Sequence, residues 1–266
     1  MYKVLPSLLK LYKEVVRLPI NSTPEEITNN PKRYPFFADC IRALDGTHLP
    51  ISVPGGYIRQ APWRRRKGGL SQNVLIVVNF QMNFLYVLAS WEGSTHDSRV
   101  INSAKAKGFK ASPSRYYVAD TRYSNTPITL TPYRGVWYHL HKQAQANTRL
   151  QNAKELFNLR HSALRNIVER TIGVFKNRFR YFKAGRHNLP LSTQVDVVYA
   201  LAAVYNFINI NNPDNLDGDL EVEDKVINKE DAGLVEAEGD VVINQRRNEI
   251  AELIWESYCQ VIGRPI

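Results

Sequence analysis

A long basic helix is the feature that most constrains how this chain folds. Between Lys154 and Arg186, apolar side chains recur at steps of four and three residues, the spacing of one helical stripe: Leu164, Val168, Ile172, Phe175 and Phe179. The same segment carries nine arginines and lysines against two glutamates. The pattern predicts a helix with one stripe facing a core and a strongly positive surface elsewhere.

Glu169 lies at the edge of this apolar stripe, one helical turn after Arg165. Two interpretations are open from the pattern alone. The glutamate pairs with Arg165 at i, i+4 on the helix surface, or it binds a metal ion on a helix whose basic side chains contact DNA. In the second interpretation the DNA contacts are Arg165, Lys176 and Arg178. Carboxylates elsewhere in the chain decide between the two.

The charge of the chain favours a polyanionic partner. The 266 residues include 35 Lys and Arg against 25 Asp and Glu, a formal charge of +10, which suits nucleic acid or an acidic membrane surface. Residues 214 to 240 contain eleven acidic residues and two lysines, so the remaining chain carries +19. The excess positive charge therefore belongs to the part that we expect to fold.

Cysteine content and hydropathy indicate the cellular compartment in which the protein is expected. The two cysteines, Cys40 and Cys259, are too few for a disulfide framework or a cysteine zinc site, which fits a reducing environment. No apolar run reaches the roughly 18 residues that cross a bilayer, and the N-terminus lacks the apolar core of a signal peptide. We expect an intracellular, soluble protein without a membrane partner.

The order of apolar patterns predicts a mixed α/β fold, with flanking helices on one sheet. Helices are expected at 1–18, 93–106, 154–186 and 191–210, with a short one after Thr23. Strands are expected within 40–53 and at 73–80, 83–91, 114–120 and 128–135. We divide the chain into a helical N-terminal segment at 1–36, a central domain at 37–212, an acidic, disordered linker at 213–245 and a C-terminal helix at 246–266.

Two aspartates stand where strands are expected to end. Asp45 is expected to end the first strand and Asp120 the fourth, and strands are otherwise depleted in aspartate. Acids at the carboxyl edge of an α/β sheet point to the place where such folds keep their sites. If Glu169 meets them, three carboxylates converge and repel, and a pair of divalent cations relieves that repulsion. Oxygen ligands select Mg²⁺ or Mn²⁺, and two such ions suit phosphodiester hydrolysis.

A succession of phrases across residues 35 to 210 resembles the PIF/Harbinger transposases and their domesticated relatives. The phrases are DGTH (45–48), WEGSTHDSRV (91–100), YYVAD (116–120), LTPYRG (130–135), ELFNLRHSALRNIVERTIGVFKNRFR (155–180) and YNFI (205–208). The resemblance implies a DDE endonuclease domain of the RNase H-like fold, with Asp45, Asp120 and Glu169 as catalytic metal ligands for two Mg²⁺ or Mn²⁺ ions.

The same resemblance implies partners and a reaction. The expected reaction is hydrolysis of DNA at transposon ends, followed by joining of the freed 3′-hydroxyl to target DNA. A Myb-like partner supplying sequence recognition and import into the nucleus is implied, and a homo-oligomer is compatible with it. Full transposases of the family also carry an N-terminal helix-turn-helix, whereas this chain begins inside what resembles a linker helix.

Two points leave alternatives open. Asp97, in the HDS phrase, is either a fourth carboxylate near the metal ions or an aspartate favoured by the dipole at a helix N-terminus. The surroundings of Asp120 depart from the family pattern at Ala119, Thr121 and Arg122, and the guanidinium of Arg122 would compete with a metal ion. The alternative function is therefore a catalytically inactive, transposase-derived DNA-binding or interaction protein.

A basic cluster lies between the first two expected strands. It consists of Trp63, Arg64, Arg65, Arg66 and Lys67. As a DNA contact it would bind phosphates, with the Trp63 ring stacked on an unpaired base. The competing interpretation is a solvated hairpin tip.

Overall fold

The computed structural model describes residues 4–18, 22–65, 68–136, 150–184, 188–212 and 241–263. The chain forms two compact units, and each is described by itself. The first comprises residues 1–20, 44–110 and 167–222, and the second comprises 21–43, 111–166 and 223–266. One strand, β1, and one helix, α6, run through both.

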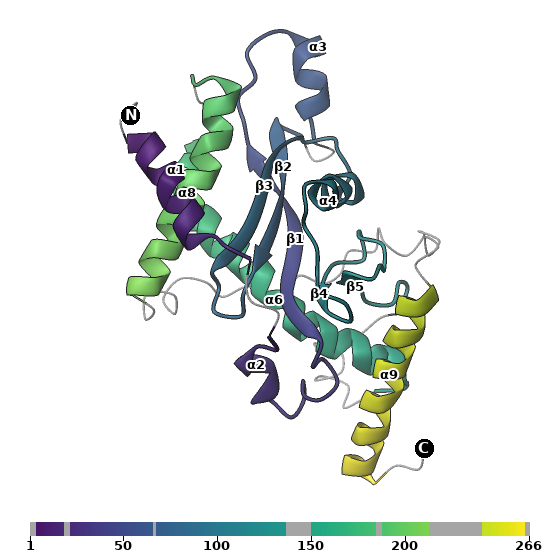
Figure 1. Ribbon diagram of the computed structural model, residues 1–266. Coiled ribbons are helices and arrows are strands. Elements are labelled where there is room, and N and C mark those ends of the chain that lie inside the picture. Colours follow the sequence, from purple (N-terminus) through teal and green to yellow (C-terminus); the bar gives the residue numbers. More distant parts are fainter. Residues whose placement is uncertain are drawn as a thin grey trace. The chain divides into compact units, whose positions relative to one another are not determined.

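Five strands form a mixed sheet in the order β3-β2-β1-β4-β5. They are β1 (Cys40–Pro50), β2 (Ser71–Val78), β3 (Phe84–Glu92), β4 (Tyr116–Val118) and β5 (Thr129–Leu130). β2 and β3 pair antiparallel, whereas β4 is parallel to both β1 and β5. The mixed α/β fold with flanking helices is therefore confirmed (Figure 1).

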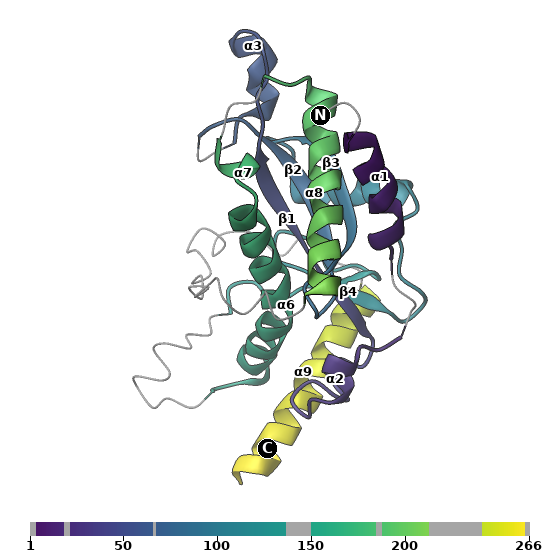
Figure 2. The same ribbon diagram turned by 90° about the vertical axis from the view of Figure 1, so that its left-hand side faces the viewer.

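In the first unit, helices cover both faces of the β2–β3 hairpin. α1 (Val4–Val15) and α8 (Leu191–Asn211) lie on one face, and α4 (Asp97–Ala106) lies on the other (Figures 1 and 2). Because both faces are covered, all eight residues of β2 are buried. This accounts for the near-continuous apolar run in the sequence, which lacks the alternation of a half-exposed strand.

An aromatic cluster joins α6 and α8 to the hairpin. α6 spans Ala153–Arg178, and Phe175 from its last turns lies 4.9 Å, centroid to centroid, from Phe84 of β3. Tyr205 of α8 completes the cluster, 5.0 Å from Phe84 and 5.8 Å from Phe175. The sequence predicted one helix to residue 186, but α6 ends at Arg178 and a short helix, α7 (Tyr181–Ala184), follows.

α8 is the one helix in the described ranges that is long and apolar enough to cross a membrane by composition. It packs instead as a core helix whose amides hold neighbouring backbone. Asn206 accepts a hydrogen bond from the Phe84 N–H (2.8 Å) and donates to the carbonyl oxygens of Phe84 (2.7 Å) and Val15 (2.9 Å). Gln194 accepts one from the N–H of Ser52 and donates to its carbonyl, at 2.8 Å each. These bonds fix α8 against the hairpin and against the segment that follows β1.

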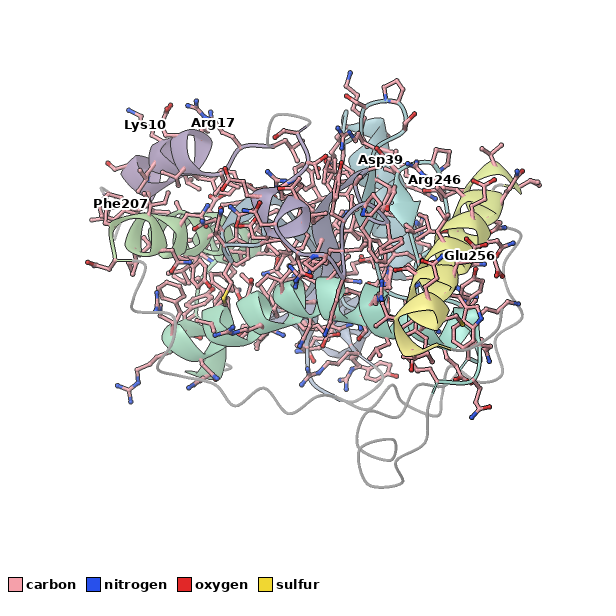
Figure 3. The ribbon with its side chains drawn as sticks, turned by 90° about the horizontal axis from the view of Figure 1, so that it is seen from below. Lys10, Arg17, Asp39, Phe207, Arg246 and Glu256 are labelled. Atoms are coloured by element: carbon pink, nitrogen blue, oxygen red, sulfur yellow. The ribbon has the colours of Figure 1, made fainter. Side chains whose placement is uncertain are left out.

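The second unit contains α2 (Glu25–Thr28), β4, β5, the N-terminal half of α6 and α9 (Val241–Ile262). α9 begins five residues before the predicted residue 246. Arg246 forms an ion pair with Asp39, seen from below in Figure 3, and Asn248 accepts a hydrogen bond from the Tyr133 hydroxyl at 2.7 Å. The acidic segment 213–240 lies outside the described residues.

Candidate functional site

Asp45 lies within β1. The sequence predicted it at the end of the strand, but β1 continues to Pro50, because the residues after Asp45 keep pairing within the sheet. Its side chain is 5% exposed, and Oδ1 accepts a hydrogen bond from the N–H of Gly46 at 2.8 Å. Since side chains alternate along a strand, Asp45 and Thr47 lie on the same face of β1.

One contact relates that face of β1 to α6. Nζ of Lys176 donates a hydrogen bond to Oγ1 of Thr47 at 2.6 Å. Glu169 precedes Lys176 by seven residues, two helical turns, so the two side chains lie on the same face of α6. The face of α6 with Glu169 is therefore turned toward the face of β1 with Asp45. Lys176 is thus engaged with the strand, and its predicted contact with DNA stays a prediction.

Asp120 lies in the second unit, two residues after the end of β4. The sequence predicted it as the last residue of that strand. Its Oδ1 accepts hydrogen bonds from the backbone N–H of Thr121 (2.6 Å) and from the Thr121 hydroxyl (3.1 Å). Its Oδ2 pairs with Nε of Arg122 at 3.2 Å. Both carboxylate oxygens thus have partners from the two residues that follow.

The charge state of Asp120 follows from opposing effects. Burial by itself would raise its pKa, but Arg165, Arg122 and the hydrogen bonds from Thr121 together hold the pKa below its ordinary value. Asp120 is therefore ionised at neutral pH. Arg165 is 8% exposed, so it is not the DNA contact that the sequence predicted; its charge acts on Asp120.

Asp97 is the first residue of α4 and is buried. Its Oδ1 accepts a hydrogen bond from Nδ2 of Asn73 at 2.7 Å, and the same amide donates to the Thr95 carbonyl. His96 occupies the N-cap position of α4 and makes no side-chain cap bond. These contacts give Asp97 a structural role at the helix start; its role as a metal ligand stays a prediction.

Within the described ranges, no group of three or more His, Cys, Asp or Glu side chains is arranged to hold a metal ion. Asp45 and Glu169 belong to the first unit and Asp120 to the second. The donor chemistry nonetheless suits a hard divalent cation, because all the candidate ligands are carboxylates and Asp120 is held ionised.

Residues 44–206 match the family described as DDE superfamily endonuclease. This chain belongs to the DDE superfamily endonuclease family. The match covers more than half of the chain and includes Asp45, Asp120 and Glu169. It confirms the family resemblance carried by the sequence phrases. Endonucleases of this superfamily generally use divalent metal ions.

A curated relative supports the same family. The Arabidopsis thaliana protein named "Protein ALP1-like" is 24% identical over 205 residues, which are 69% of this chain and 46% of the relative. The chain thus spans less than half the length of that protein. No solved structure matches the chain.

The structure revises the predictions made for the basic cluster between the first two strands. Trp63 is only 9% exposed, so its ring is not available to stack on a base, and the prediction for this residue is wrong. It ends the short 3-10 helix η1 (Ala61–Trp63) and anchors the segment. Arg64 and Arg65 are exposed as predicted, and Arg66 and Lys67 lie outside the described residues. Arg178 lies over the Tyr205 ring and donates to Asn209, so its charge is partly engaged within the fold.

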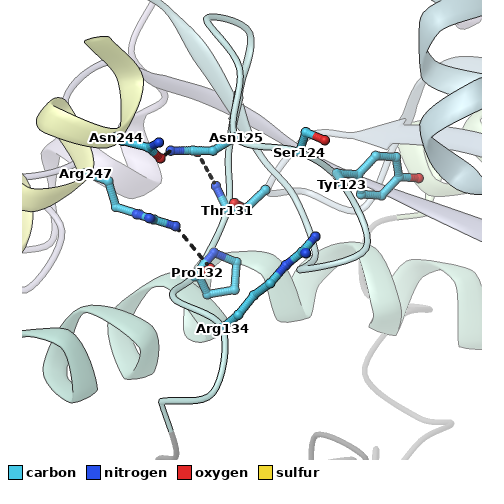
Figure 4. A pocket seen from close by; sticks show the side chains of 8 residues that line it. All are labelled: Tyr123, Ser124, Asn125, Thr131, Pro132, Arg134, Asn244 and Arg247. Atoms are coloured by element: carbon cyan, nitrogen blue, oxygen red, sulfur yellow. Dashed lines mark hydrogen bonds between the residues drawn. The ribbon is translucent and has the colours of Figure 1, made fainter. Parts of the chain in front are cut away.

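A polar pocket that the sequence did not predict lies beside the Asp120 loop in the second unit (Figure 4). It is small and partly open to solvent, and it is lined by Tyr123, Ser124, Asn125, Thr131, Pro132, Arg134, Asn244 and Arg247. Asn125 donates to Oδ1 of Asn244 on α9 (2.8 Å) and accepts from the N–H of Thr131 (3.0 Å). Arg134 donates from Nε to the Thr121 carbonyl at 3.1 Å. The loop that carries Asp120 is therefore fixed from both sides.

His161 of α6 is a second feature that the sequence did not predict. Its side chain is fully buried, and Nε2 lies 2.9 Å from the Leu130 carbonyl oxygen of β5, which makes Nε2 the protonated nitrogen. Burial, with a smaller contribution from Arg165, lowers the pKa of His161 to about 4. The imidazole is thus neutral at physiological pH and fastens α6 to the sheet. The sequence did not indicate that His161 is buried, because a histidine on a basic helix can equally well be exposed.

Proposed function

We propose that the chain is a divalent-metal-dependent DDE nuclease of the RNase H-like fold that acts on DNA. Its metal ligands are Asp45, Asp120 and Glu169. The hydrogen bond between Lys176 and Thr47 is the observation that carries the proposal, because it turns the Glu169 face of α6 toward the Asp45 face of β1.

The strand register supports including Asp120. Ala43 of β1 is paired with Val118 of β4 in a parallel register, and Asp45 and Asp120 each follow two residues later along the chain. Arg165 lies near enough to Asp120 to lower its pKa, and Glu169 follows Arg165 by one turn of α6.

The pair between Asp120 and Arg122 is compatible with metal binding. The Arg122 side chain is 45% exposed, so it can turn into solvent, and exposed pairs contribute about 0–1 kcal/mol. When bound, Mg²⁺ or Mn²⁺ would activate a water molecule and stabilise the leaving oxygen of a phosphodiester. The chain's own contribution is to hold Asp120 ionised and oriented through Thr121 and to hold the Glu169 face of α6 through Lys176.

The proposal also names the DNA substrate, the joining reaction and the partners. The substrate is the end of a transposon, and the freed 3′-hydroxyl is joined to target DNA. A Myb-like partner would supply sequence recognition and nuclear import, and the active form would be an oligomer. These points rest on the resemblance to PIF/Harbinger transposases and not on particular contacts.

One observation favours a second candidate, an inactive transposase relative that binds DNA. Both oxygens of Asp120 are engaged by Thr121 and Arg122. If Arg122 stays in place, its guanidinium substitutes for a cation and no metal ion binds. Such a protein would bind DNA through its basic surface equally well in EDTA.

Nicking of supercoiled plasmid with Mn²⁺ or with EDTA separates the candidates. The nuclease proposal predicts nicking that requires metal, that is lost in Asp120→Asn and Glu169→Gln, and that persists in Glu252→Gln. Glu252 is an exposed residue of α9, so its substitution makes the same chemical change away from the candidate site. Persistent nicking in Asp120→Asn would contradict the proposal.

A further inference from the structure

The first unit presents two large apolar side chains at a projecting tip. They belong to α3 (Tyr57–Gln60), which extends beyond the strand ends in Figure 1. Tyr57 is 71% exposed and Ile58 is 88% exposed. An isolated apolar side chain on a surface is ordinary, but two adjacent ones at the end of a projection indicate a surface that meets a partner.

The surroundings of these side chains indicate what the partner is. Arg59, Arg64 and Arg65 are exposed beside them, and the Arg64 guanidinium lies 4.8 Å from the centroid of the Tyr57 ring. The sequence contains no aspartate or glutamate from Gly46 to Trp91, a stretch that includes the whole tip. A surface with concentrated positive charge and no acid is complementary to a polyanion.

The tip is firmly held, so its exposed side chains are presented in a fixed place. The Gln60 amide donates to the carbonyl oxygens of Val53 (3.1 Å) and Gly55 (2.9 Å), which closes the loop before α3. Gly55 has φ of +113°, a conformation that glycine adopts readily. Behind α3, Trp63 is buried and the Ser94 N–H donates to the Pro62 carbonyl at 3.0 Å.

We propose that this tip, comprising Tyr57, Ile58, Arg59, Arg64 and Arg65, is a wedge that inserts Ile58 between the base pairs of bound DNA. The arginines contact phosphates on either side, and Tyr57, backed by Arg64, supports Ile58 from behind. Apolar wedges flanked by cationic side chains kink duplexes by partly unstacking one base step. The inference rests on the proposed function only in taking DNA as the partner; it adds that the chain selects DNA that is distorted or easily distorted.

A binding comparison in EDTA tests the wedge without requiring metal or cleavage. The probes are a fluorescein-labelled duplex and the same duplex with a two-nucleotide bulge, which is already unstacked. Because the bulge removes the cost of unstacking, the wild type should bind it about tenfold more tightly than the perfect duplex. Ile58→Ser should bind both probes equally. Ile210→Ser removes another exposed isoleucine, on α8, and should keep the wild-type preference.

The arginines give an independent readout. Arg59→Ala, which leaves the contact between Arg64 and Tyr57 in place, should weaken binding to both probes by a similar factor and lower the slope of log affinity against log salt by about one. In a duplex with 2-aminopurine at a central step, wild-type binding should raise the fluorescence, and Ile58→Ser should not.

Equal affinity of the wild type for both probes, or an unchanged bulge preference in Ile58→Ser, would overturn the wedge. Either result would leave the metal-dependent nicking test unaffected. Conversely, absence of nicking with an intact bulge preference would reject the nuclease and retain the wedge.

Discussion

Nε of Arg122 lies 3.2 Å from Oδ2 of Asp120, so the second aspartate of the candidate triad is held by the second residue after it. The pair joins a half-exposed guanidinium to a carboxylate that is also bonded by Thr121. A divalent cation can bind Asp120 only if its interaction with the carboxylate is stronger than this pair.

Removing the Arg122 charge should strengthen metal binding. In Arg122→Ala the cation no longer competes with a guanidinium, and because exposed pairs contribute at most about 1 kcal/mol, the Mn²⁺ affinity should rise by up to roughly fivefold. Isothermal titration with Mn²⁺ measures this. Arg99→Ala, which removes an exposed charge from α4, should leave the affinity within twofold of the wild type. An unchanged affinity in Arg122→Ala would show that the pair does not restrain the site.

Asn206 should be a major contributor to the stability of the first unit. Asn206→Ala removes three hydrogen bonds and leaves the buried N–H and C=O of Phe84 without their side-chain partner, so we expect a loss of about 2–4 kcal/mol in the free energy of unfolding. Urea titration followed by circular dichroism measures it. Asn211→Ala, which loses one exposed bond to Phe207, should change stability by less than about 0.5 kcal/mol. Comparable losses in the two variants would contradict this role.

Gly93 is required by close packing between the hairpin and the base of the tip. A Cβ there would lie 2.5 Å from the Ser71 carbonyl oxygen and 2.7 Å from that of Trp63, and backbone atoms cannot move away cheaply. We expect Gly93→Ala to lower the free energy of unfolding by about 2 kcal/mol. Gly56→Ala meets open space and should be nearly neutral, so thermal unfolding of the pair isolates the packing effect. Equal melting temperatures would show that the strand and the loop can separate without cost.

Buried His161 should make stability depend on acid pH. The unfolded chain takes up a proton on this histidine near pH 6.5, whereas the folded protein resists it until about pH 4. The unfolded state therefore binds more protons between these values, and stability falls as pH is lowered through that window, by on the order of 3 kcal/mol. Urea titrations from pH 7.5 to 4 should show this slope in the wild type and in His96→Gln, an exposed control. His161→Gln should show a reduced slope; an equal slope would assign the effect to other groups.

Sequence periodicity predicted the long helices and the mixed sheet, because each element carries its own apolar pattern. It predicted strand ends less well: Asp45 was expected at the end of β1, which continues five residues further. Aspartate disfavours strands only weakly, and pairing within the sheet outweighs that preference.

The candidate site was predictable in its residue types but not in its contacts. Nothing local to Thr47 or Lys176 indicates that they bond across 129 residues. Arg165 and Trp63 were both expected at a DNA surface, and both are buried, because exposure depends on what packs against a side chain. A basic or aromatic pattern by itself does not specify that packing.

The most direct test of the account is a calorimetric titration of Mn²⁺ into the wild-type chain and into Asp45→Asn, Asp120→Asn, Glu169→Gln and the control Glu252→Gln. We expect the wild type and Glu252→Gln to bind, and each of the three candidate-ligand variants to lose binding while keeping its fold. A folded wild type that binds no Mn²⁺, or candidate-ligand variants that bind as the wild type does, would contradict the assignment of Asp45, Asp120 and Glu169 as a metal site.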